Sequence, residues 1–260
     1  KGPPMPSLTK RVAIPSGINT GLTSASSSLM LSLLGNPRSN YSQDCQPVTN
    51  AKLKAHIKTK HVGPFRATGF DLALESLTAV MADIRAEQPS VFAALSSAGM
   101  LCCRFKRGSS SSISNHAWGT AIDLKLDGIL DAYGDGKVQF GLTLIAPIFN
   151  RHKWFWGATF PKEDGMHFEV STEKMKAWHA AGKLFSGTAA PDDDKMIMGE
   201  RSMKVKDLQV RLNKLGEALK TDGIFGPGTH AAVVAFQGTH GLKPDGIVGP
   251  VTWAKLVSLT

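Results

Sequence analysis

Residues 114–124 (SNHAWGTAIDL) and residues 164–169 (DGMHFE) are the two stretches that decide the fold. Both alternate polar and apolar positions, which is typical of a strand with one face towards a core. Asp123 lies on the polar face of the first stretch, and His167 lies on the polar face of the second. The pattern therefore predicts two strands that, if they pair, place Asp123 and His167 side by side.

A third residue with metal-binding chemistry precedes the first strand. Gly119 lies between His116 and Asp123 and would let the chain bend so that His116 joins the other two. Two imidazoles and one carboxylate supply three ligands to a tetrahedral Zn²⁺ and leave the fourth position for water, as catalytic sites do. Each residue alone fits an ordinary polar position at a strand end, but the three together predict a catalytic zinc site.

The spacing Ser-x-His-x-x-Gly-x-Ala-x-Asp, followed by Asp-x-x-His, resembles the pattern of the M15 family of zinc D,D- and L,D-peptidases. That family includes D-Ala-D-Ala carboxypeptidases, dipeptidases and phage endolysins. The positions that fill the pattern are Ser114, His116, Gly119, Ala121, Asp123, Asp164 and His167. The resemblance implies that His116, Asp123 and His167 bind zinc and that Asp164 is the catalytic base. Some members have Glu at that place, and the shorter Asp164 is closer to the endopeptidase branch.

Five further residues near the motif are candidates for the same site. Arg104 is predicted to stabilise the oxyanion, because the family usually places an Arg in this region. Ser114, Arg107 and Trp118 are predicted to contact substrate, with a surface charge and a core aromatic as the alternatives for the last two. Glu169 is predicted to orient a zinc ligand from behind, with a solvated strand residue as the alternative.

The surrounding sequence predicts an α+β fold with an antiparallel sheet. Apolar residues at helical spacing predict a helix over residues 70–87, and Pro89 ends it or opens a second short helix. Residues 100–105 are apolar and predict a strand. Residues 1–65, rich in Ser, Pro, Asn and Thr, predict a loop-rich N-terminal extension packed on a peptidase domain over residues 66–185.

The C-terminal part carries an internal repeat. Residues 222–229 (DGIFGPGT) are echoed by residues 245–252 (DGIVGPVT), and each copy is typical of a tight turn that feeds a helix. The repeat predicts a small three-helix all-α domain over residues 200–260, after a linker over residues 186–199. It resembles the peptidoglycan-binding domain 1 family, and that resemblance alone implies binding to the cell wall.

The charge of the chain points to an anionic partner. The sequence holds 30 Lys and Arg against 21 Asp and Glu, a net charge of +9, and almost all of the excess lies before residue 191. Such an excess favours nucleic acid, an anionic membrane or an anionic wall polymer. No basic helix or aromatic stacking motif accompanies the charge, so we expect no nucleic-acid partner and predict peptidoglycan instead.

Composition also bounds the compartment. The longest apolar run, residues 29–34, is far shorter than the roughly 18 residues of a membrane helix, so we expect no transmembrane segment. No clear signal peptide is expected, so action in the periplasm or extracellular wall would follow phage-type lysis or delivery by a secretion system.

We expect a monomer. Of the three cysteines, Cys45 could pair with Cys102 or with Cys103.

The two signatures together predict a zinc-dependent peptidase that cleaves peptidoglycan stem peptides. It would be an endolysin or antibacterial effector that hydrolyses L-Ala-D-Glu or D,D bonds. One alternative is a D-Ala-D-Ala carboxypeptidase for wall remodelling. An alternative of another class is a non-catalytic wall-binding protein with a structural zinc site, and the presence of Asp164 argues against it.

Overall fold

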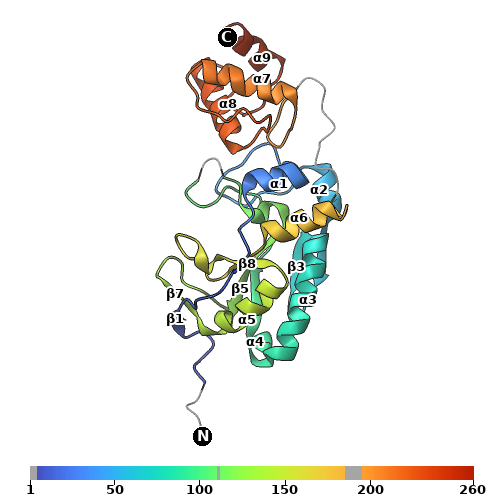
Figure 1. Cartoon of the computed structure of the whole chain (residues 1–260), viewed down its shortest axis with the longest axis vertical. Coiled ribbons are helices and arrows are strands. Elements are labelled where there is room, and N and C mark those ends of the chain that lie inside the picture. Colours follow the sequence, from blue (N-terminus) through green and yellow to red (C-terminus); the bar gives the residue numbers. More distant parts are fainter. Residues whose placement is uncertain (1–4, 110–111, 185–194) are drawn as a thin grey trace. The chain divides into compact units, whose positions relative to one another are not determined.

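A computed structural model of the chain describes residues 5–109, 112–184 and 195–260 (Figure 1). The described chain forms two compact units. The first comprises Lys1–Ala25, His56–Leu101 and Trp118–Ala180, and the second comprises Ser26–Ala55, Cys102–Ala117 and Ala181–Thr260. The predicted α+β class with antiparallel strands is confirmed. The domain limits 1–65, 66–185 and 200–260 stay predictions.

The first unit is built on a five-stranded antiparallel sheet. Its order is β4 (Leu95–Gly99), β5 (Ala121–Leu126), β9 (His167–Val170) and β8 (Trp154–Trp156), and β6 (Ile129–Leu130) pairs with β5. Strands β5 and β9 are the two predicted from the opening motifs, and they lie next to each other. Their apolar side chains are fully buried, which fixes which face each polar residue occupies.

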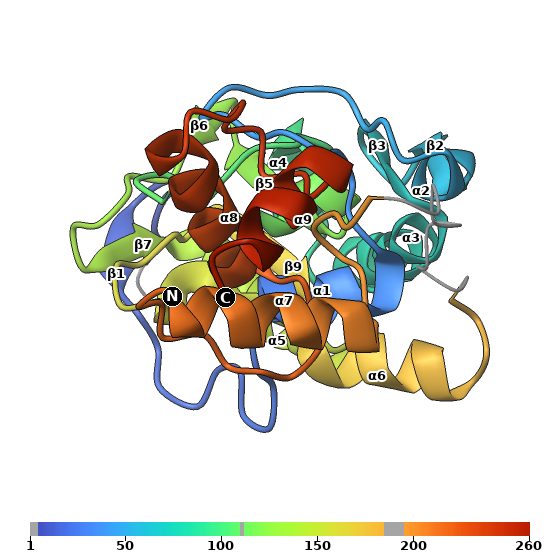
Figure 2. The same ribbon diagram turned by 90° about the horizontal axis from the view of Figure 1, so that it is seen from above.

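Helices cover the sheet of this unit. The predicted helix over residues 70–87 is α3 (Asp71–Glu87), and Pro89 opens α4 (Pro89–Ala94). Both pack against α5 (Phe140–Arg151), which also contacts β8 (Figure 1). Helix α3 also lies beside the strands β2 (Ile57–His61) and β3 (Arg66–Phe70) (Figure 2). Helix α6 (Thr172–Ala180) directly follows β9. The apolar stripe of α3 is buried as its periodicity predicts.

Two smaller antiparallel pairs complete the unit. Strand β1 (Arg11–Ala13) pairs with β7 (Lys137–Gln139), and β2 (Ile57–His61) pairs with β3 (Arg66–Phe70). The first pair shows that the segment before residue 25 joins the unit through backbone hydrogen bonds. The stretch predicted as a loop-rich extension therefore contains more regular structure than its composition suggests.

The prediction of a strand over residues 100–105 is wrong. The strand in this region is β4, which ends at Gly99, and the backbone of that glycine has a φ of 133° beside a shift in the β4–β5 register. Beyond it the chain leaves the sheet, and Cys103 forms only an isolated bridge with Gln46. The apolar residues of this stretch therefore do not indicate a strand, because a segment can be buried without pairing along its length with a neighbouring strand.

The second unit begins with α1 (Ser27–Leu34) and α2 (Ala51–His56). Ser26 caps α1 by accepting a hydrogen bond from the Leu29 backbone N–H. The disulfide in this unit joins Cys45 to Cys102, whose Cα atoms are 4.9 Å apart, and leaves Cys103 free and buried.

The C-terminal module contains three helices, as predicted: α7 (Met203–Lys214), α8 (Pro227–Thr239) and α9 (Pro250–Val257). Its buried core draws on all three helices and the segments before them. It comprises Met196, Val205, Leu208, Leu212, Phe225, Ala232, Val233, Phe236, Val248 and Leu256. Met196 belongs to this core and bridges Val248, although it falls in the predicted linker. The rest of that linker up to residue 194 lies outside the described residues.

A buried glutamine organises each copy of the repeat. The Gln209 side-chain amide donates to Asp222 Oδ1, the Ile224 carbonyl and Thr229 Oγ1, and its oxygen accepts from the Gly223 N–H. Gln237 makes the same set of hydrogen bonds in the second copy, to Asp245, Gly246, Ile247 and Thr252. The repeated sequence is therefore a repeated hydrogen-bond network.

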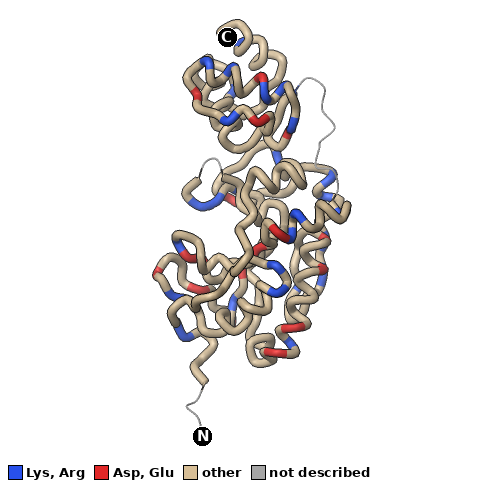
Figure 3. The backbone as a smooth tube through the Cα atoms, viewed as in Figure 1, with Lys and Arg blue, Asp and Glu red and all other residues tan. Residues whose placement is uncertain are grey.

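No helix in the described part of the chain is long and apolar enough to cross a membrane. Basic and acidic residues both occur along the backbone of each unit (Figure 3). The Lys and Arg excess lies in the first 190 residues, as the sequence already indicated.

Candidate metal centre

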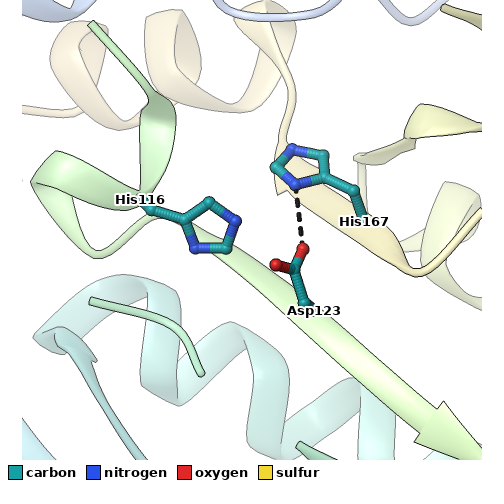
Figure 4. A group of neighbouring side chains, drawn as sticks. All are labelled: His116, Asp123 and His167. Atoms are coloured by element: carbon teal, nitrogen blue, oxygen red, sulfur yellow. Dashed lines mark hydrogen bonds and ion pairs between the residues drawn. The ribbon is translucent and has the colours of Figure 1, made fainter. Parts of the chain in front are cut away.

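The register of two neighbouring strands brings Asp123 and His167 together. The two residues are directly opposite each other in the antiparallel β5–β9 pair. Residues opposite each other in such a pair project to the same face, with Cβ atoms about 5 Å apart. Asp123 Oδ1 accordingly lies 3.2 Å from His167 Nδ1 (Figure 4). The pairing predicted from the alternating pattern is confirmed at residue level.

His116 reaches the same place from a short 3-10 helix, Asn115–Trp118. Gly119 follows with a φ of 66°, and a Cβ at that position would lie 2.7 Å from the Phe70 backbone nitrogen. The Gly119 carbonyl accepts a hydrogen bond from that same nitrogen. Only glycine fits this close approach, and the bend predicted at Gly119 allows the His116 ring to face the two strands.

The three side chains form a group that fits a metal ion. One donor atom from each of His116, Asp123 and His167 lies within 4.8 Å of the others. Tetrahedral zinc with bonds of about 2.0–2.2 Å holds its ligand atoms about 3.3–3.6 Å apart, close to the Asp123–His167 separation. Two imidazoles and a carboxylate are also a donor set that zinc accepts. The residues present therefore fit a zinc ion.

A buried carboxylate lies behind His167. Glu169 Oε2 is 2.9 Å from His167 Nε2, and the residue is only 2% exposed. Burial alone would lower the pKa of His167, but hydrogen bonds from the ring to Asp123 and Glu169, and the charges of both, raise this pKa to about 10. Metal-binding histidines commonly donate their second N–H to a carboxylate in this way. Glu169 is thus a buried partner of a candidate ligand, and the solvated alternative is wrong.

Asp164 lies on the turn that leads into β9. Its N–H donates to the Gly157 carbonyl, and its own carbonyl accepts from the His167 N–H at 3.1 Å. Trp156 also holds this turn, because its indole N–H donates to the Gly165 carbonyl at 2.7 Å. These contacts tie the backbone of the predicted base to the strand that carries His167.

The other predicted site residues, on the stretch before and within the His116 turn in sequence, differ in exposure. Ser114 is buried, and its N–H donates to the Arg104 carbonyl. The Arg104 guanidinium donates to the Phe105 carbonyl. Arg107 is exposed, whereas Trp118 is fully buried and belongs to the core. The roles of Ser114 and Arg107 in substrate contact and of Arg104 at the oxyanion stay predictions, and the burial of Trp118 fits the alternative of a core aromatic.

Two supports of the site were missed at the sequence level. Ser24 donates to Glu169 Oε1, and the Cys102 N–H donates to the His116 carbonyl. Ser24 lies in a Ser/Thr-rich stretch with no periodic signal, so nothing local distinguished it. Cys102 carries no signal in the sequence beyond its possible pairing with Cys45.

Two segments of the chain match known families. Residues 107–170 match the M15 peptidase family model described as D-alanyl-D-alanine carboxypeptidase, and residues 201–256 match the model of a peptidoglycan binding domain. Both predicted resemblances are confirmed over these segments. A search of curated proteins finds no match.

One solved structure is similar over part of the chain: a peptidoglycan-binding protein from Clostridioides difficile in complex with glutamine hydroxamate. It is 40% identical over 28% of this chain and 43% of that chain, with a TM-score of 0.24. This chain thus spans less than half of the length of that structure.

Proposed function

Starting from an M15 peptidase segment joined to a peptidoglycan-binding domain, we propose that this chain is a zinc-dependent peptidase that cleaves peptidoglycan stem peptides. The observation that carries the proposal is the group of His116, Asp123 and His167, whose donor atoms lie within 4.8 Å of one another. Asp164 precedes this group on the β9 turn. The two family matches by themselves support a peptidase that acts on peptidoglycan.

The roles of the residues follow from general peptidase chemistry. Zinc, when bound by the three side chains, supplies a Lewis acid that polarises the scissile carbonyl. Asp164 takes a proton from the attacking water and returns it to the leaving amine. Arg104 donates to the oxyanion that develops on the carbonyl. Ser114 and Arg107 contact the substrate, and Trp118 supports the His116 turn from the core.

The bond that is cleaved has two candidates. Asp164, rather than Glu, favours an endopeptidase that hydrolyses L-Ala-D-Glu or D,D bonds. The description of the family that matches residues 107–170 favours a D-Ala-D-Ala carboxypeptidase. A carboxypeptidase must recognise the free terminal carboxylate of the stem peptide, whereas an endopeptidase accepts substrates that continue on both sides of the bond.

Mass spectrometry of purified muropeptides, digested with and without a chelator, tests both the metal and the bond. Release of a single D-Ala identifies a carboxypeptidase, and separation of L-Ala from D-Glu identifies an endopeptidase. Activity must disappear with the chelator and return with added zinc. A native protein that releases nothing from sacculi overturns the proposal and favours a wall-binding protein with a structural zinc site.

The setting of this activity is the cell wall, reached as an endolysin or as a delivered antibacterial effector, with the chain acting as a monomer. The C-terminal module supplies wall affinity, and the excess of Lys and Arg in the first 190 residues adds attraction to anionic wall polymer. That attraction weakens with salt. If removal of residues 191–260 left wall binding unchanged at high salt, this division of roles would be wrong.

A further inference from the structure

A residue of the N-terminal segment contacts the carboxylate behind His167. The Ser24 hydroxyl donates to Glu169 Oε1 at 2.5 Å, and the Ala25 N–H donates to the same oxygen at 3.2 Å. The other oxygen, Oε2, is the one 2.9 Å from His167 Nε2. Each oxygen of Glu169 is therefore held by a different part of the chain.

The backbone around Ser24 is fixed independently of any metal. The Ser24 carbonyl accepts from Thr172 Oγ1 at 3.0 Å, and the Thr172 N–H donates to the Thr23 carbonyl at 2.9 Å. Both the N–H and the hydroxyl of Thr23 donate to Glu173. Thr23 and Ser24 are thus bound to the start of α6, directly after the strand that carries His167 and Glu169.

We infer that Ser24 is a positioning residue of the zinc centre, acting through Glu169 on His167. A neutral imidazole has one N–H donor and one acceptor nitrogen, and the partner of the first decides which nitrogen carries the lone pair. Glu169 accepts a hydrogen bond from Nε2–H, which leaves the lone pair on Nδ1, the nitrogen beside Asp123 Oδ1, available to a metal ion. Ser24 and the Ala25 N–H hold the carboxylate in the plane that this requires. The inference rests on the proposed metal centre.

Ser24 lies outside the segment that matches the peptidase family, residues 107–170, whereas its partner Glu169 lies inside it. The contact between them is also not a general packing contact. The Ser24 hydroxyl donates a hydrogen bond to Glu169, which is 2% exposed. Removal of a hydrogen-bond donor leaves an oxygen of this buried carboxylate less well satisfied, which costs free energy. Removal of Ser24 therefore acts first on the orientation of Glu169.

The test is the zinc affinity of the full chain, measured by competition with a chromophoric chelator at fixed pH. Ser24→Ala should raise the zinc dissociation constant by about 3- to 10-fold, somewhat less than the loss of a direct partner of a ligand. Ser24→Thr keeps a hydroxyl and should bind zinc nearly as the native protein does. Thr23→Ala is the matched control, because it removes a hydrogen bond from a neighbouring hydroxyl to a different carboxylate, that of Glu173.

Two further measurements separate positioning from loss of fold. In the zinc-loaded native protein, nitrogen NMR of His167 should find the proton on Nε2, and in Ser24→Ala this signal should broaden or shift. Ser24→Ala should also have little additional effect on zinc affinity in a Glu169→Gln background, because its action passes through Glu169.

Equal losses of zinc affinity in Ser24→Ala and Thr23→Ala, or native affinity in Ser24→Ala, would overturn the inference. A native chain that binds no zinc would overturn both the metal centre and this inference. A native chain that binds zinc but leaves muropeptides intact would overturn the proposed function only, and the zinc measurements would still decide the role of Ser24.

Discussion

Asp123 and His167 are paired across β5 and β9, so the distance between the two candidate ligands is set by the sheet. Both strands are buried in the core, and neither residue depends on a loop for its position. Only His116 comes from a turn, and Gly119 and the Phe70 backbone hold that turn closely. Two candidate ligands on paired strands and a third on a closely packed turn form a group that is already arranged to hold a metal ion.

Asp164→Asn should abolish peptide cleavage but leave zinc binding intact. The amide cannot take the proton of the attacking water, and loss of a general base lowers kcat by about 10²- to 10⁴-fold. Asp164 is not one of the three grouped donors, so zinc content should stay at the native level. Muropeptide hydrolysis and metal analysis on the same preparation check this. Glu75→Gln, on the exposed side of α3, is the control; full activity in Asp164→Asn would show that another group is the base.

Cys45→Ser should destabilise the chain and weaken its metal site together. The disulfide closes a loop with a sequence separation of 57. Opening a loop of this length raises the entropy of the unfolded chain, which lowers the free energy of unfolding by about 4 kcal/mol. The Cys102 N–H donates to the His116 carbonyl, so release of Cys102 also frees the turn that carries His116. Urea unfolding and chelator competition measure the two effects.

The free thiol offers a check on that experiment. Burial raises the pKa of Cys103 to about 12, so its thiol stays protonated near neutral pH and should resist alkylation in the folded protein. Reduced native protein should then unfold as Cys45→Ser does. Rapid labelling of Cys103 without denaturant, or equal stability of the oxidised and reduced chains, would contradict the prediction.

Gln209→Ala and Gln237→Ala should lower the stability of the C-terminal module by similar amounts. Each substitution leaves buried donors and acceptors of one repeat turn unpaired, which costs about 1–3 kcal/mol per unsatisfied group. Hydrogen exchange of α8 and α9 amides reports the loss in the full chain. Gln43→Ala, at an exposed position, should change nothing there. A marked difference between the two glutamines would mean that the repeat copies are not equivalent.

The module should lose stability as the pH falls below neutrality. Burial lowers the pKa of His230, and the nearby Asp245, which opposes this shift, does not outweigh it. A histidine whose folded pKa lies below its unfolded value of about 6.5 contributes fully above that value, and the contribution is lost as the pH falls towards the folded pKa. Hydrogen exchange of α8 amides between pH 8 and 5 should follow this course. The slope should shrink in His230→Gln but persist in His240→Gln; a native module insensitive to pH would refute the assignment.

The part of the site that follows from local pattern was predictable from the sequence. Alternation indicates the faces of β5 and β9, and Gly119 marks the bend before β5, so the sequence alone groups Asp123, His167 and His116. Proline and the apolar period likewise placed α3 and the start of α4.

The rest depends on contacts between distant segments. Residues 100–105 are apolar apart from Arg104, yet they follow a glycine with positive φ at the end of β4, and Cys102 is joined to Cys45 outside the sheet. Ser24 and Glu169 form a hydrogen bond although they are 145 residues apart in the sequence. No periodic pattern predicts a contact between segments so distant. Gln209 and Gln237 lie outside the repeated eight-residue motif, so the repeat was visible while the residues that hold it were not.

The pairing of β1 with β7 bears on how this protein can be divided in the laboratory. A fragment cut to the family match at residue 107 would lack the strand partner of β7, the hydroxyl of Ser24 and both halves of the disulfide. Such a fragment would keep every candidate zinc ligand and still be expected to misfold. Chimaeras that exchange the wall-binding module should therefore retain the chain from β1 to the end of α6, and shorter catalytic cassettes are poor starting points for engineering.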